Sequence, residues 1–224
     1  MQDFVFNSKV IVHSGFDGRR GYEVAYSKDV GRGESNIYRR VAGGVGWPGS
    51  GRNGFLVVLA EDMDEDLEHN VRHLHRLAEL EEWEGLSFTT LPPMFAAMSF
   101  LSGNKGVHPW YGLECPSWED MLRYNRDRAA LKRSPLRITQ LRDPDFERMM
   151  GAIFRRTTTQ KTLHLGKSNI PAALARLGRD VSGENFTDHP MATALLMAVN
   201  GLEYSQPGRP APARNRIADR VGGY

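Results

Sequence analysis

The chain has 224 residues and a formal net charge of +2, and 40% of its residues are hydrophobic, a balance typical of a globular protein with a buried core. Its single cysteine, Cys115, excludes an internal disulfide framework and a zinc site built from several thiolates. No apolar run approaches the ~18 residues of a membrane-spanning helix. The N-terminus also lacks a secretory signal pattern, so we expect a soluble, cytoplasmic protein without a membrane partner.

The first 37 residues have the pattern of extended structure. Phe4–Val12 is rich in β-forming residues, the turn-forming stretch Gly15–Gly18 follows, and Gly21–Tyr26 alternates apolar and polar side chains. We therefore expect residues 1–37 to form an N-terminal β-ribbon extension.

A β-hairpin is predicted next. Tyr38–Val45 and the strongly apolar Phe55–Ala60 have strand character, and the loop between them ends in the turn-forming pair Asn53 and Gly54. A loop this short joins antiparallel strands and is too short for a parallel crossover. The loop also contains a G-x-G-x-x-G pattern, but a proline interrupts it and a strand follows where nucleotide binding needs a helix. The hairpin is therefore the favoured interpretation.

Asp64–Trp83 is predicted to be a helix, because Leu67, Val71, Leu74 and Leu77 recur at helical spacing. Three histidines fall within this segment: His69, His73 and His75. On a helix, His69 and His73 would share a face opposite the apolar stripe, among charged residues. We favour a solvent-exposed face over the alternative, a metal site.

Further along, short strands are expected to alternate with helices. The predicted strands are Leu86–Leu91, Trp110–Glu114, Leu136–Leu141 and Thr162–Leu165, whereas Met94–Leu101 is ambiguous between helix and strand. The predicted helices begin at Ser117, Asp145, Ile170 and Asp188 or Thr187, and end near Leu131, Arg156, Leu177 and Leu202. This alternation predicts one α/β domain over residues 38–204, with a mixed β-sheet and helices on both faces. Residues 205–224, which hold prolines and arginines, are expected to form a flexible basic tail.

Three basic residues are candidates for phosphate contacts. Arg155, Arg156 and Lys161 flank three threonines, and guanidinium, hydroxyl and amine groups all bind phosphate. Cations are also common at the end of an exposed helix, where they complement the helix dipole, and that interpretation is the favoured one.

Two carboxylates stand at positions suited to metal binding. Glu114 follows a predicted strand, at the sheet edge where sites of open α/β sheets form, and Asp188 opens the last predicted helix. Their alternative roles are an ordinary strand-end acid and a helix N-cap.

At these residues the sequence resembles the nuclease domain of large terminase subunits from tailed phages, which has a ribonuclease H-like fold. The resemblance rests on residues 40–48 followed by the apolar Phe55–Ala60, and on residues 188–195, which open with the Asp188-His189 pair. It implies a DNA substrate and two divalent ions, Mg²⁺ or Mn²⁺, held by acids on the first strand, a later central strand and the C-terminal helix. Glu114 and Asp188 would be the catalytic metal ligands.

The sequence also departs from that family. Gly46 stands where the first-strand aspartate is expected, and Ala192 or Thr193 stands where some relatives have a second aspartate. Loss of the first-strand ligand should weaken two-metal catalysis. Glu61 or Asp62, at the end of the second predicted strand, is a possible substitute, although the end of a hairpin partner is a different point in space. Two functions stay open: a metal-dependent DNA endonuclease, or a non-catalytic domain that binds DNA or assembles with a packaging partner. No Walker A motif is present, so a motor ATPase would have to be a separate partner.

A small-molecule enzyme that uses Cys115 as a nucleophile is a third possibility. No base or cationic partner for the thiol is identifiable, so we favour a structural cysteine.

Overall fold

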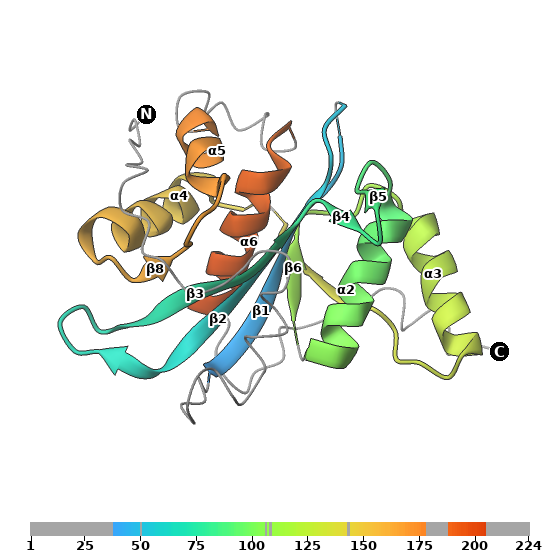
Figure 1. Cartoon of the computed structure of the whole chain (residues 1–224), viewed down its shortest axis with the longest axis horizontal. Helices are drawn as coiled ribbons and strands as arrows, with labels where there is room; N and C mark the ends of the chain where they lie inside the picture. The colour runs from blue at the N-terminus through green and yellow to red at the C-terminus, as the bar shows by residue number, and fades with distance from the viewer. Residues whose placement is uncertain are drawn as a thin grey trace.

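The computed structural model describes residues 38–49, 51–105, 107, 109–142, 144–177 and 188–204. The predicted N-terminal ribbon and the predicted basic tail lie outside the described residues. Within them, a six-stranded mixed sheet separates two groups of helices, with strand order β7-β6-β1-β2-β3-β8 (Figure 1). The strands, including a separate two-stranded β4–β5 ladder, are β1 (Tyr38–Gly46), β2 (Phe55–Asp66), β3 (Val71–Leu80), β4 (Glu82–Trp83), β5 (Leu86–Ser87), β6 (Trp110–Gly112), β7 (Ile138–Gln140) and β8 (Leu163–His164).

Strand direction gives the six-stranded sheet two distinct edges. Strands β1, β2 and β3 form an antiparallel meander; β6 pairs parallel with β1, β7 parallel with β6, and β8 parallel with β3. Every strand except β2 therefore runs in one direction. We call the edge where these five strands end the carboxyl edge, and the edge where they begin the amino edge.

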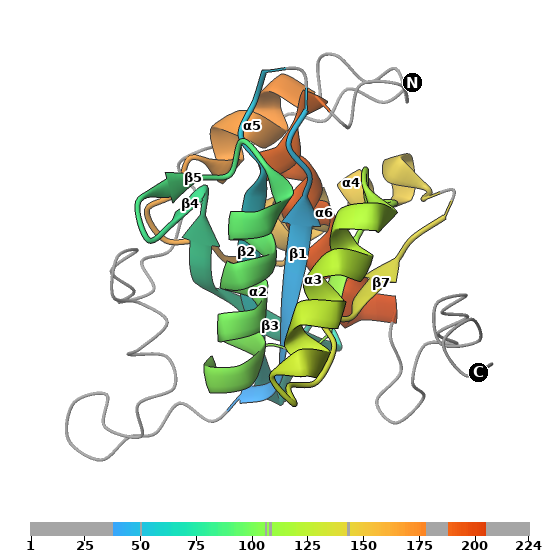
Figure 2. The ribbon, with the colours of Figure 1, turned by 90° about the vertical axis from the view of Figure 1, so that its right-hand side faces the viewer.

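Helices cover both faces of the sheet, as the sequence predicts. They are α2 (Leu91–Lys105), α3 (Trp118–Ala130), α4 (Phe146–Phe154), the π-helix η2 (Arg155–Thr159), α5 (Ile170–Leu177) and α6 (Pro190–Tyr204). Figure 2 views the sheet from the side of α2 and α3, with α5 and α6 on the far side. Alternate residues of β2 enter different cores: Val57 and Leu59 pack in the core with α4, α5 and α6, and Leu56 and Val58 in the core with α2 and α3. This period-two alternation of apolar side chains is what a strand buried on both faces requires.

The predicted helix over Asp64–Trp83 is wrong. The segment continues β2 to Asp66, turns at residues 67–70 and returns as β3 and β4. Asp66 stabilises the turn, because its carboxylate accepts hydrogen bonds from the backbone N–H groups of Glu68 (2.8 Å) and His69 (3.2 Å). Asn70 completes the turn at φ +54°, a left-handed conformation that asparagine tolerates better than most residues.

A β-bulge explains the part of the helical spacing that runs from Leu74 to Leu77 and Ala78. The pairing between β2 and β3 shifts between Val58 and Leu59, which pair with Ala78 and Arg76 and leave Leu77 as the extra residue. Because of this shift, Leu74 packs in the core with α6, whereas Leu77 and Ala78 pack in the core with α2. A strand with a bulge can thus place apolar residues three and four positions apart.

Elsewhere the predicted elements mostly agree with the structure. The predicted strand over Leu86–Leu91 shrinks to the two residues of β5, and Leu91 already begins α2, with two prolines in its first turn, where no backbone N–H is needed. The ambiguous Met94–Leu101 is helical. Ser117 caps α3 through its side-chain oxygen, as predicted, and Asp145, predicted as the first residue of its helix, is the N-cap of α4. The hairpin loop and α5 are also confirmed.

Candidate functional site

Strands β1 and β6 bring the Glu114 segment to the carboxyl edge. Val45, near the end of β1, pairs with Gly112, the last residue of β6. The Trp47 indole N–H donates a hydrogen bond to the backbone carbonyl of Leu113, 3.0 Å away. Glu114 follows with an exposed side chain, so its carboxylate is available to a ligand at this edge.

Helix α6 brings Asp188 to the same edge. Its first residue, Pro190, lies directly against Gly46, the last residue of β1. Asp188 lies two residues before α6 and is half-buried, and the next residue, His189, has its Nδ1 atom 3.4 Å from a guanidinium nitrogen of Arg52. Glu114 and Asp188 therefore both stand within two residues of segments that contact the end of β1. Whether they share a cation stays a prediction, and no cluster of three potential metal ligands includes them among the described residues.

The position of the expected first-strand acid has no room for a side chain. A Cβ atom on Gly46 would lie 1.8 Å from the carbonyl oxygen of Pro190, and one on Gly44 would lie 1.9 Å from that of Ala194. Both obstacles are backbone atoms of α6, which cannot rotate away as a side chain does. The two glycines thus let the helix backbone lie directly on β1, and this close packing excludes a carboxylate at position 46.

The three basic candidates lie away from these acids. Lys161 precedes β8 by two residues, and Arg155 begins the π-helix that leads to it, so both exposed cations belong to the amino edge. Arg156 is only 5% exposed; its guanidinium contacts the Glu203 carboxylate (2.5 Å) and the Arg72 carbonyl (2.9 Å). Arg156 thus joins α6 to β3, a structural role that replaces the phosphate contact suggested by the sequence.

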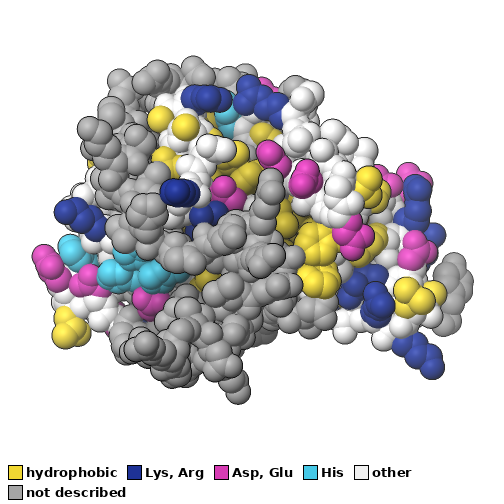
Figure 3. All heavy atoms as spheres, in the orientation of Figure 1, with side chains coloured by type: hydrophobic (Ala, Val, Ile, Leu, Met, Phe, Trp, Pro, Cys, Tyr) yellow, Lys and Arg dark blue, Asp and Glu magenta, His cyan; other side chains and the backbone are white. Residues whose placement is uncertain are grey.

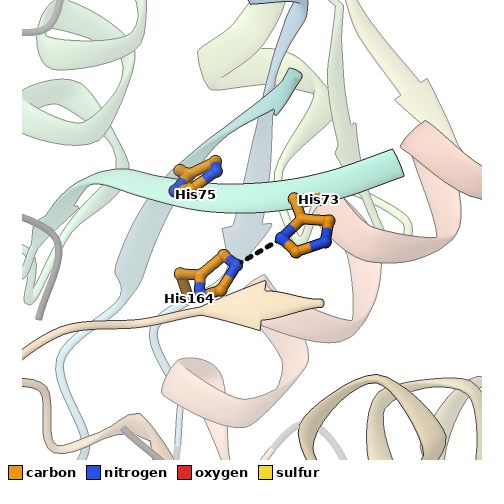
Figure 4. A group of neighbouring side chains, drawn as sticks. All are labelled: His73, His75 and His164. Atoms are coloured by element: carbon orange, nitrogen blue, oxygen red, sulfur yellow. Dashed lines mark hydrogen bonds between the residues drawn. The ribbon is translucent and has the colours of Figure 1, made fainter. Parts of the chain in front are cut away.

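Three histidines form a cluster near the amino edge, on β3 and β8. His73 and His75 lie two residues apart on β3, and His164 pairs with His75 in the parallel β3–β8 ladder. One potential ligand atom from each ring lies within 4.8 Å of the other two, and His73 Nδ1 is 2.7 Å from His164 Nε2 (Figure 4). The ring of His164 stacks on both others, with centroid distances of 4.6 Å to His75 and 4.9 Å to His73. We call these residues the histidine cluster.

Two carboxylates of β2 lie within hydrogen-bond distance of histidines in the cluster. His75 Nε2 lies 2.9 Å from an oxygen of Asp62, and His73 Nε2 lies 3.1 Å from an oxygen of Asp66. Asp66 also contacts His69, at 3.4 Å. Figure 3 shows histidine side chains gathered at the surface with acidic side chains beside them. The histidine cluster is therefore a solvent-accessible group of ring nitrogens that can bind a metal ion. The two carboxylates can accept hydrogen bonds from the ring N–H groups of His73 and His75.

The surroundings of the cluster shift two pKa values. Burial, reinforced by the neighbouring His75 and His73, lowers the pKa of His164 from 6.5 to about 4, so the ring is neutral at pH 7. The hydrogen bond from His73 lowers the pKa of Asp66 from 3.8 to about 2, against the effect of burial. The cluster thus combines a neutral imidazole with an ionised carboxylate, which is the state that metal binding requires.

The sequence pattern favours an exposed helix face for His73 and His75 and gives no signal for His164; the structure places all three on paired strands. The signal that could have revealed them is the H-x-H spacing, because residues two apart on a strand point to the same face. His164 could not have been added from sequence, since it joins the cluster only through the β3–β8 pairing, about 90 positions along the chain.

Cys115 is a buried residue, 3% exposed, whose thiol donates to the Ser117 carbonyl at 3.4 Å. Burial raises the pKa of this thiol, and the nearby Asp120 and Glu114 raise it further. A thiol with a raised pKa is a poor nucleophile at pH 7, so the structural interpretation of Cys115 is supported.

Comparisons with known proteins returned no family model, no curated protein and no solved structure that matches this chain. Among the described helices, none combines the length and the apolar character needed to cross a bilayer.

Proposed function

We propose that this chain is a ribonuclease H-like domain, related to the nuclease domain of terminase large subunits, that binds DNA without cutting it. The topology supports the relationship. An antiparallel meander is continued by the parallel strands β6 and β7, and the C-terminal helix α6 packs against β1. The resemblance implies functional positions on the first strand, a central later strand and the last helix, and here those three elements meet at the carboxyl edge.

One observation carries the non-catalytic part of the proposal: the contact between Gly46 and Pro190. Two-metal hydrolysis needs carboxylates that clamp both ions around the reacting phosphate. The first-strand carboxylate is absent, and because a Cβ at position 46 would lie 1.8 Å from the Pro190 oxygen, a carboxylate there would force α6 away from β1. Glu61, one possible substitute, forms a bidentate ion pair with Arg40, and Asp62 contacts His75, toward the amino edge. Neither acid reaches the carboxyl edge.

DNA contact at the carboxyl edge would use the side chains that remain there. Arg52 is exposed in the β1–β2 loop and its guanidinium lies beside His189, which gives this edge a cation. Phosphate contacts of this kind give affinity and a strong salt dependence without sequence preference. A packaging role would add a separate motor ATPase as a partner.

The second candidate function is a metal-dependent endonuclease with Glu114 and Asp188 as Mg²⁺ or Mn²⁺ ligands. The observation in its favour is that both acids stand next to the end of β1, at the edge where such sites form in open α/β sheets. Two ligands can hold one ion if water completes its coordination.

A plasmid assay separates the two candidates. The purified chain is incubated with supercoiled DNA and Mg²⁺ or Mn²⁺, and we expect no nicked or linear product. Cleavage that Glu114→Ala and Asp188→Ala abolish, and that Glu119→Ala leaves intact, would replace our proposal with the endonuclease. Glu119 is a suitable control because it is an exposed acid in the first turn of α3.

A gel-shift series tests DNA binding itself. We expect retardation of duplex DNA at low salt that is lost as salt rises. Arg52→Ala should weaken binding, and the Arg155→Ala/Lys161→Ala double variant, at the amino edge, should weaken it less. The absence of retardation at low salt would refute the DNA role, and a reversed order of the two variants would move the contact surface to the amino edge.

A further inference from the structure

We propose that His73, His75 and His164 form a binding site for a divalent transition-metal ion, and that Zn²⁺ fits it best. The site is independent of the proposed DNA contact, because it lies on β3 and β8, toward the amino edge of the sheet. It also does not depend on the relationship to terminases.

The strand register sets the positions of the three ligands. His73 and His75 alternate with the buried Leu74 on β3, so both rings project from the same face of the strand. His164 lies opposite His75 in the neighbouring strand. Tetrahedral zinc with Zn–N bonds of about 2.0–2.1 Å separates ligand nitrogens by about 3.4 Å. The three potential ligand atoms already lie within 4.8 Å of one another, so small side-chain rotations suffice.

The contacts behind the rings assign which nitrogens face the ion. Asp62 and Asp66 each lie within hydrogen-bond distance of an Nε2 atom, on His75 and His73 respectively. Each of these Nε2 atoms can then carry its proton toward a carboxylate, which leaves Nδ1 unprotonated as a ligand. Metal-binding histidines are commonly held by such carboxylates, which fix the tautomer and strengthen the donor. His164 offers Nε2, which lies 2.7 Å from His73 Nδ1 and carries the proton of that hydrogen bond in the metal-free chain. Metal binding at Nε2 then requires the neutral His164 ring to carry its proton on Nδ1 instead.

Ligand chemistry determines the class of ion. Imidazole nitrogens favour Zn²⁺, Cu²⁺ and Ni²⁺, whereas Mg²⁺ and Ca²⁺ require oxygen ligands. Three protein ligands leave a fourth tetrahedral position, and the partial exposure of His73 and His75, 33% and 24%, gives water access to it. Sites with three protein ligands and one open position can bind and activate water.

A bound ion would also hold β8 onto β3. β8 has only two residues in the ladder, and His164 is one of them. Because the ion binds the folded chain, Zn²⁺ at 100 times its dissociation constant should raise the Tm by about 5–10 °C.

The test uses the full chain without a histidine tag, stripped of metal. Calorimetric titration with Zn²⁺ should give one ion per chain, and Co²⁺ should give visible absorption bands characteristic of a site with fewer than six ligands. His75→Asn and His164→Asn should each weaken Zn²⁺ binding at least about 100-fold. Asp62→Asn, which removes a supporting carboxylate, should weaken it about 10- to 100-fold.

Two controls locate the ion. His69→Asn changes a neighbouring histidine that contacts Asp66 but lies outside the cluster, and binding should stay within about threefold of the original. The Glu114→Ala/Asp188→Ala double variant should bind Zn²⁺ normally. Loss of binding in that variant would place the ion at the carboxyl edge and overturn the proposal.

The proposal also fails if wild-type protein binds no stoichiometric Zn²⁺, or if His164→Asn binds as tightly as wild type. Circular dichroism shows whether each variant folds. If a variant does not fold, the decision rests on the wild-type chain, whose imidazole NMR signals should shift for three histidines on Zn²⁺ addition. Unshifted signals would then refute the site.

Discussion

The carboxyl edge and the histidine cluster differ in how the backbone supplies their ligands. At the carboxyl edge, Glu114 lies in the loop after β6 and Asp188 lies just before α6. The strand β1 ends there in Gly46, which packs directly against the backbone of α6. In the histidine cluster, two paired strands present three nitrogen donors in register, with two carboxylates behind them. Close packing of a helix on a strand thus leaves no room for a side chain at one edge of the sheet, whereas strand pairing brings three potential ligands together near the other.

The largest effect is expected from adding the missing acid. Gly46→Asp would place a Cβ 1.8 Å from the Pro190 carbonyl oxygen, so α6 would have to move away from β1. Inserting atoms into a packed core costs about 1–3 kcal/mol and more against rigid backbone, so we expect a loss of at least about 3 kcal/mol. Urea denaturation measures this free energy of unfolding.

Gly112→Ala is the matched control on the neighbouring strand. Its Cβ would lie 3.3 Å from the Val45 Cβ atom, a tight contact that a small shift relieves, so the loss should stay near 1 kcal/mol. If Gly46→Asp were as stable as wild type, the close packing of α6 on β1 would be refuted. DNA cleavage by that variant would further show that the carboxyl edge can still support catalysis.

An intermediate effect is expected at the base of the histidine cluster. Arg156→Ala would leave Glu203 unpaired and would remove the guanidinium contacts to the Arg72 carbonyl and to Thr162, which precedes β8. Breaking a buried ion pair costs about 3–5 kcal/mol, and the partial exposure of Glu203 places the expectation near the lower figure. Because β8 would lose an anchor, Zn²⁺ affinity should fall as well.

Arg155→Ala is the matched control, because Arg155 is the exposed neighbour of the buried Arg156. This variant should change the free energy of unfolding by less than about 0.5 kcal/mol. Equal unfolding midpoints for Arg156→Ala and Arg155→Ala would contradict the expectation that the buried arginine contributes more to stability than its exposed neighbour. If Arg156→Ala is destabilised but binds Zn²⁺ with unchanged affinity, the ion pair stabilises the fold without holding β8 in place for metal binding.

The elements around the carboxyl edge could be predicted from the sequence because their signals are local. The hairpin loop ends in a turn-forming pair, Ser117 and Asp145 cap their helices, and strand runs alternate with apolar helix patterns. Local sequence patterns do not predict how closely α6 packs against β1. The consequence of Gly46, that no carboxylate fits there, became visible only from the packing against Pro190.

The region of the histidine cluster was mispredicted for two physical reasons. The β2–β3 bulge moved Leu77 out of phase with Leu74, which reproduced the spacing of a helix. The β3–β8 pairing joins residues far apart in the chain, and no local pattern encodes such a contact. For the same reason the sequence favours a surface position for Arg156, because its partner Glu203 lies 47 positions away in the chain.

The smallest effect expected is an acid sensitivity confined to the histidine cluster. In the folded chain the pKa of His164 is about 4, below its ordinary 6.5, so between these values the unfolded chain binds more protons. The stability of the metal-free protein should therefore fall as the pH decreases from 6.5 to about 4 and change little below that through this group. His73 and His75 on β3 oppose protonation of the ring, and Asp62 on β2 favours it.

The magnitude and the control for this acid sensitivity follow from the same contacts. Because the ring is only half-buried, solvent screening reduces the contribution to on the order of 1 kcal/mol. Urea midpoints at pH 7, 5.5 and 4.5 in the presence of EDTA measure it, and His164→Gln should flatten the dependence. His69→Gln should leave it unchanged, since that residue lies outside the cluster. If His164→Gln kept the full slope, the acid sensitivity would belong to other groups, and the neutral ring that distinguishes this region from the carboxyl edge would not be the cause.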